Sequence, residues 1–124
     1  MMDKLLAVAF GGSMGAVARF LIYHLMERAH EGRFPWASLT VNLAGSLLIG
    51  LLWGIFDKFY IPSGVRLFIF IGLLGSFTTY STFSFDVFSL WKEGEFRTAL
   101  VYLLGTNIGG IGLAFAGYYL SRLV

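Results

Sequence analysis

The sequence is poor in charged residues and contains no cysteine. Charged side chains make up 13% of its 124 residues, about half the share of an average soluble domain. Without cysteine, disulfide bonds and thiolate metal sites are excluded. The net charge of +2 is too small to indicate a nucleic-acid partner. Proline is also scarce, whereas hydrophobic residues reach 57%, so the composition favours a single membrane domain over residues 1–124.

Sequence motifs for catalysis and for proton relay are missing as well. There is no nucleophile elbow, no phosphate-binding loop and no metalloprotease helix. No run of carboxylates or histidines crosses an apolar segment. No Asp or Glu lies deep within one, and Asp86 in the third segment comes nearest. His24 and His30 flank a loop without a partner cluster. We therefore expect a protein that is not an enzyme.

Four apolar segments are long enough to cross a bilayer, which takes roughly 20 residues in a helix. They cover about 5–26, 36–56, 65–91 and 96–120. The first is expected to be a span and not a removable signal peptide. The separators are short and hold nearly all the charges. Because short links make successive spans run antiparallel, we predict an all-α membrane protein with four transmembrane helices.

Lysine and arginine are balanced between the two ends of these spans. One end of the bundle receives Lys4, Lys58, Arg66 and Arg122, and the other receives Arg28, Arg33, Lys92 and Arg97. Membrane orientation normally follows an excess of these residues on one side, and here there is none. Chance explains such a balance in a small sample. The alternative is that the chain inserts in both orientations and assembles as an antiparallel homodimer. An oligomer also suits the size, since four helices can hardly enclose a pathway alone.

Small residues recur at helical spacing in three of the spans. They are Gly11 and Gly15 in the first, Gly50 and Gly54 in the second, and Gly105, Gly109 and Gly112 in the fourth. Small residues at this spacing let two helix backbones approach closely. We interpret them as helix-packing positions.

The third span concentrates hydroxyl groups in the stretch "GLLGSFTTYSTFSFD", residues 72–86. A hydroxyl buried without a hydrogen-bond partner costs free energy. The span is also too long for one straight crossing, and Gly72 and Gly75 followed by Ser and Thr predict a broken helix. Broken backbone at membrane depth is tolerated only where protein buries it or where it lines a cavity. Carbonyl groups freed by the break could hold a cation.

Other polar residues lie within the remaining spans. Arg19 either anchors its helix at the head groups or makes a wet vestibule positive. Asn42 and Ser46 are one turn apart, and Asn42 is either a clamp between helices or a ligand. Tyr102 and Thr106 share one face of the fourth span. A path rich in donors, with one positive group and no deep acid, favours an anion.

The stretch "GLLGSFTTYSTF" resembles the signature of the Fluc (CrcB) family of fluoride ion channels, roughly G-x-x-G-G-x-T-T-F-S-T-F. "GGSMGAVARF" in the first span and "TVNLAGSLLIG" in the second are also similar to segments of that family. The likeness covers the whole chain, including its length and four-span plan. Two positions depart: Tyr80 stands where the family has Phe, and Ser76 stands where it has a second Gly.

The resemblance implies a passive, fluoride-selective channel that exports fluoride from the cytoplasm across a bacterial cell (inner) membrane. It implies an antiparallel homodimer with two pores and a structural sodium ion at its centre, held by the main-chain carbonyls of Gly75 and Thr78. The residues that it places on the anion pathway are Arg19, Asn42, Tyr80, Ser81, Thr82, Phe83, Tyr102 and Thr106.

Two other functions are compatible with a chain of this plan. A small four-span multidrug antiporter of dual topology would need a carboxylate within the membrane to couple protons, and the first span offers none. A structural membrane subunit would use the buried Asn, Thr and Tyr groups only to join helices. Fluoride efflux, proton-coupled exchange or the absence of flux in liposomes separates the three.

The charge balance predicts that both orientations occur. Reporters fused to the C-terminus should be found on both sides of the membrane. Two or three lysines added to the "KEGE" loop at 92–95 should force one orientation and lower activity, because antiparallel partners are then lost. A single native orientation, with full activity in the lysine-enriched variant, would exclude the antiparallel assembly.

Overall fold

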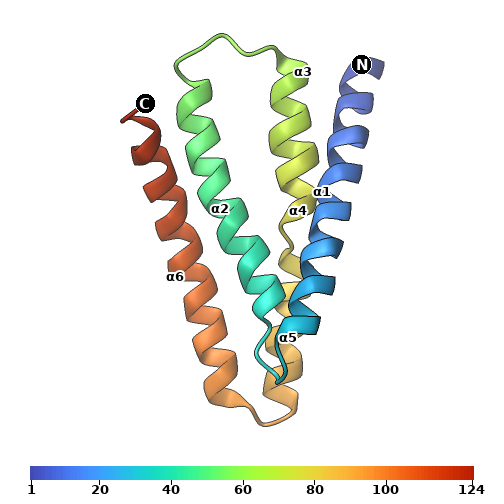
Figure 1. The fold of residues 1–124 in the computed structure, drawn as a ribbon, viewed down its shortest axis with the longest axis vertical. Coiled ribbons are helices and arrows are strands. Elements are labelled where there is room, and N and C mark those ends of the chain that lie inside the picture. The colour runs from blue at the N-terminus through green and yellow to red at the C-terminus, as the bar shows by residue number, and fades with distance from the viewer.

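The computed structural model describes all 124 residues and is entirely helical (Figure 1). Four helices are long and apolar enough to cross a membrane, and they cover Met2–Ala29, Trp36–Phe56, Ser63–Lys92 and Phe96–Ser121. This confirms the prediction of four spans: the second has its predicted bounds, and the other three extend slightly beyond theirs.

The first, second and fourth spans are single helices, whereas the third is divided. Helix α1 is Met2–Ala29, α2 is Trp36–Phe56 and α6 is Phe96–Ser121. The third span consists of α3 (Ser63–Arg66), a π-helical stretch η1 (Leu67–Leu74), α4 (Gly75–Phe77) and α5 (Tyr80–Lys92). Helix α2 packs chiefly against α6, and α1 packs chiefly against η1 and α4. Both termini lie at the same end of the bundle as the loop between α2 and α3 (Figure 1).

Glycines make the two main helix pairs close. A Cβ atom at Gly50 of α2 would overlap the carbonyl oxygen of Ala114 in α6, and one at Gly117 of α6 would overlap that of Leu47. Gly11 of α1 lies in the same way against the backbone of η1. These contacts confirm the packing interpretation for much of the glycine pattern. Gly105 and Gly112, by contrast, have open space within this chain.

The third span is broken at Thr78 and Thr79, a few residues after the predicted glycines. Thr78 has φ −82° and ψ 160°, and Thr79 has φ −148° and ψ 116°, so both are extended. Gly75 is helical, with φ −62° and ψ −34°. Gly72 is buried, and a Cβ atom there would lie 2.9 Å from the Cα of Gly11. The predicted break is therefore confirmed, and it lies at the threonines of the predicted stretch, whereas Gly72 and Gly75 themselves remain helical.

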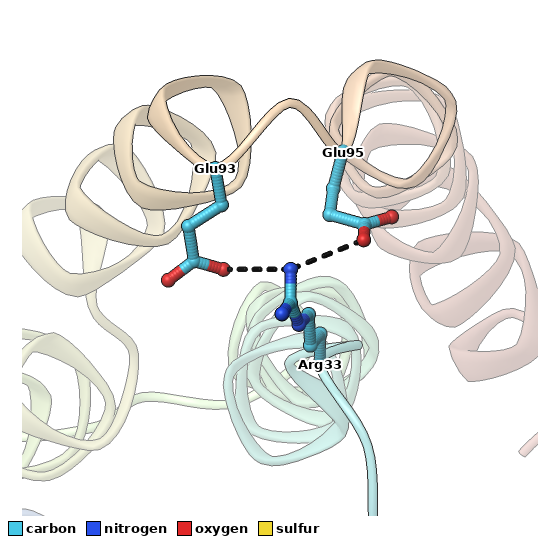
Figure 2. A network of polar contacts seen from close by, with 3 residues as sticks. All are labelled: Arg33, Glu93 and Glu95. Carbon is cyan, nitrogen blue, oxygen red and sulfur yellow. Dashed lines mark hydrogen bonds and ion pairs between the residues drawn. The ribbon is translucent and has the colours of Figure 1, made fainter.

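Charged residues join the loops at each end of the bundle. Arg33, between α1 and α2, lies 3.5 Å from Glu93 and 3.1 Å from Glu95, on either side of the α5–α6 turn (Figure 2). All three side chains are well exposed, so these ion pairs add little stability. At the opposite end, Arg66 donates a hydrogen bond of 3.0 Å to the Phe56 carbonyl at the end of α2. That cation satisfies a carbonyl that the helix leaves unpaired.

The glycine contacts predict which glycines tolerate a methyl group. Gly117→Ala should destabilise the fold by about 1–3 kcal/mol, the usual cost of overpacking, since Leu47 backbone occupies the space. Gly112→Ala, on the same helix, should be neutral or stabilising, because Ala is the better helix former. Thermal unfolding followed by size exclusion measures both. Equal stability of the two variants would contradict the close α2–α6 packing.

Candidate functional site

An open cavity of about 320 Å³ lies beside the break in the third span. Residues of α2, η1, α4, α5 and α6 line it, together with the two extended threonines. Four of the residues predicted for the anion pathway lie in its wall: Asn42, Tyr80, Phe83 and Thr106. Gly75 and Thr78, predicted for the cation, lie in the same wall. The structure thus brings residues from three spans to one site.

Two aromatic rings stand next to each other at the start of α5. The ring centroids of Tyr80 and Phe83 are 5.8 Å apart, and the planes are tilted by 48°. Phe83 is 6% exposed, whereas Tyr80 is 80% exposed. On its other side, Phe83 lies 5.1 Å from the ring of Tyr102. One ring is therefore part of the core, and the other is left uncovered by this chain.

Much of the hydroxyl cluster is used by the backbone around the break. The Thr78 hydroxyl donates to the Leu74 carbonyl at 3.0 Å, and the Thr79 hydroxyl accepts from the Thr82 amide at 3.2 Å. The second of these bonds caps the N-terminus of α5. Ser76 donates to the Gly12 carbonyl of α1 at 2.8 Å. These side chains offer the backbone an alternative to the helical ladder.

Two side chains from other helices also bond to the break. The Asn42 side chain accepts from the Thr79 amide at 2.8 Å and donates to the Thr79 carbonyl at 3.2 Å. The Nε of Arg19 donates to the Ser76 carbonyl at 3.0 Å. Arg19 lines a different cavity, of about 330 Å³, whose wall consists of residues of α1.

The hydroxyl of Thr106 is the one buried side-chain polar atom that has no hydrogen-bond partner in this chain. Thr106 lies in the cavity wall, one helical turn after Tyr102, which the sequence places on the same face. Tyr102 is fully buried and donates to the Asp86 carboxylate at 2.9 Å. Tyr102, Ser81 and Thr82 do not line the cavity. Tyr102 and Thr106, which share one face of α6, therefore have different surroundings.

A second cluster of polar side chains, around Asp86 in the middle of α5, was not predicted from the sequence. The Tyr23 hydroxyl of α1 lies 2.5 Å from that of Ser38 in α2, and Ser38 is 2% exposed. Asp86 lines two further cavities, one of which also includes Tyr23 and Ser38. Single hydroxyls in an apolar span give no periodic signal, so nothing in the sequence pairs these residues.

Carbonyl oxygens are the candidate ligands for a cation at the break. Gly75 and Thr78 both line the cavity. Thr78 lies outside the helices, and its carbonyl accepts no hydrogen bond from the backbone or from a side chain of this chain. A hard cation prefers oxygen ligands of this kind. A residue of the cavity wall with an unpaired carbonyl therefore fits such an ion.

Comparison with known proteins decides the family. The family model described as "CrcB-like protein, Camphor Resistance (CrcB)" matches residues 6–118. The chain belongs to the CrcB family. This confirms the resemblance seen in the sequence, whose motifs lie in α1, in α2 and at the break in the third span.

Curated CrcB-family relatives are similar to this chain over nearly their whole length. Fluoride-specific ion channel FluC 1 of Nitrobacter hamburgensis is 41% identical, covering 97% of this chain and 96% of its own. Fluoride-specific ion channel FluC of Aquifex aeolicus is also 41% identical, covering 98% of each. FluC of Leptospira interrogans is 39% identical, covering 96% of this chain and 94% of its own.

Proposed function

We propose that this CrcB-family protein is a passive, fluoride-selective channel of the bacterial inner membrane that exports fluoride from the cytoplasm. The names of its relatives support fluoride as the ion. The observation that carries the proposal for this chain is the Thr106 hydroxyl, which is buried, unpaired and in the wall of the cavity beside the break. A buried hydroxyl without a partner is costly unless a passing ion or water accepts its hydrogen bond.

The surroundings of this hydroxyl suit a small anion that holds its water tightly. The Thr106 hydroxyl can donate a hydrogen bond in place of that water, and the rings of Phe83 and Tyr80 lie in the same wall. Ring edges carry partial positive charge, so they can contact an anion without the strong attraction of a full charge. Conduction needs binding that is favourable enough to enter and weak enough to leave. Neutral donors and ring edges meet both needs.

The functional unit in this proposal is an antiparallel homodimer with two pores. A single chain leaves its cavity open and the ring of Tyr80 uncovered. A second copy supplies the missing wall, and the balance of Lys and Arg allows it to insert in the opposite orientation. Arg19, Ser81, Thr82 and Tyr102 remain predicted members of the pathway, outside the cavity that one chain forms.

A structural sodium ion at the dimer centre is part of the proposal. Its ligands in each chain would be the carbonyl oxygens of Gly75 and Thr78, two residues of the cavity wall. A bound cation would join the two chains and satisfy the Thr78 carbonyl, which nothing in this chain pairs. Its contribution is to the assembly and not to a chemical step.

Phe83→Ile tests the aromatic contact with the anion. Ile keeps an apolar side chain but has no ring edge, so fluoride efflux per folded dimer should fall by about tenfold, the factor given by ~1.4 kcal/mol at the barrier. Efflux from liposomes, read with a fluoride electrode and normalised to dimer recovered by size exclusion, measures this.

The matched control is Phe85→Ile, on the same helix. Phe85 is 65% exposed and does not line the cavity, so its replacement should leave efflux unchanged. Normal efflux per dimer in Phe83→Ile, with lower yield of folded protein, would assign Phe83 to packing alone.

Sodium should stabilise the assembled protein more than other monovalent cations. At 100 times its dissociation constant, a bound ion stabilises by about 2.7 kcal/mol, so the melting temperature should be higher in sodium than in potassium at equal ionic strength. Thr78→Ser keeps the carbonyl and should keep this difference, whereas Gly75→Val should abolish it. Equal melting temperatures of the unmodified protein in the two salts would remove sodium from the proposal.

A further inference from the structure

Side chains of two other helices hold the broken backbone of the third span. The Asn42 amide of α2 makes a reciprocal pair of hydrogen bonds with the amide and carbonyl of Thr79, at 2.8 Å and 3.2 Å. Arg19 of α1 donates to the carbonyl of Ser76, at 3.0 Å. Three polar backbone groups, two in the break and one just before it, are thereby paired. Backbone groups at membrane depth require such partners.

The Asn42 contact has the form of a pairing between two strands. Thr79 is extended, with φ −148° and ψ 116°, and an extended residue presents its amide and carbonyl side by side to a neighbour. A side-chain amide has one oxygen and two N–H donors. The pair with Thr79 uses the oxygen and one N–H. Asn42 is thus engaged by the backbone before any ion arrives.

Arg19 bonds to the backbone next to the break. It is half-buried, and its Nε bonds to Ser76 of α4. The cavity beside the break does not include Arg19 in its wall. The Ser76 hydroxyl lies 2.8 Å from the Gly12 carbonyl of α1 and 2.7 Å from the Gly72 carbonyl of its own span, so it shares one proton between them. Helix α1 therefore contacts Ser76, two residues before the break, through both Arg19 and Gly12.

We propose that Asn42 and Arg19 are positioning residues that clamp the break from α2 and from α1. The clamp keeps Thr78 and Thr79 extended, which leaves the Thr78 carbonyl free and places Tyr80 and Phe83 in the cavity wall. In this assignment Asn42 shapes the pathway through Thr79, and its second N–H is left for the cavity. Arg19 acts on the break through the hydrogen bond of its Nε to Ser76. The inference rests on the proposed pathway for its effect on flux, but the clamp itself can be measured without fluoride.

Hydrogen–deuterium exchange of the full-length protein in detergent tests whether Asn42 holds the break. Asn42→Ala removes both bonds to Thr79, so amides at 76–82 should exchange roughly tenfold faster. Ser46→Ala is the control, because Ser46 is one turn along α2 in the same cavity wall and makes no hydrogen bond to the break. It should leave exchange at 76–82 unchanged. Unchanged exchange in Asn42→Ala together with lost fluoride efflux would show a direct contact with the anion.

Two replacements with side chains of similar length test whether Arg19 holds the break. Arg19→Gln places an N–H donor where the arginine Nε lies but removes the charge, whereas Arg19→Met removes both. The clamp predicts slow exchange at 76–82 and nearly normal efflux for Gln, with faster exchange and low efflux for Met. A role for the charge alone predicts low efflux for both, with exchange as slow as in the unmodified protein.

These measurements separate the clamp from the proposed function. If the unmodified protein carries no fluoride, the channel proposal fails, while faster exchange in Asn42→Ala and Arg19→Met still supports the clamp. If Asn42→Ala yields no folded protein, the comparison of Arg19→Gln with Arg19→Met still tests the clamp. Equal exchange at 76–82 in the Gln and Met variants would overturn the inference.

Discussion

The structure depends on one constraint, which is that a broken helix at membrane depth must find new partners for its backbone groups. At the break, hydrogen-bond partners for the backbone come from the hydroxyls of Thr78 and Thr79, from Asn42 of α2 and from Arg19 of α1. These partners come from three of the four spans. The break therefore ties the bundle together at the point where the cavity forms.

Close helix packing provides the frame in which this pairing is possible. Gly50 and Gly117 bring α2 and α6 into backbone contact, and Gly11 does the same for α1 and η1. In lipid there is little hydrophobic force between helices, so such close contacts supply much of the association. With α1 and α2 fixed, the side chains of Arg19 and Asn42 reach the break. The cavity beside it draws its walls from α2, α6 and the divided third span.

Polar residues in the spans divide into two groups by what they bond. Ser76, Thr78 and Thr79 bond to backbone near the break, so their hydroxyls are already committed. Thr106 and the Thr78 carbonyl are left unpaired in the cavity wall. Groups of the second kind are available to an ion without breaking an existing bond. Counting hydroxyls in the sequence therefore overestimates the donors that a pathway can offer.

The sequence by itself determined the spans, the family and the existence of a break, because these follow from local composition and contiguous motifs. An apolar run of 20 residues must be helical in lipid whatever lies beside it. The tertiary structure decided the rest. Gly72 predicts a break but packs against Gly11, and Tyr102 bonds to Asp86 while Thr106 stays free. Each outcome is set by a partner on another helix, and hydrogen bonds between such residues leave no pattern in one sequence.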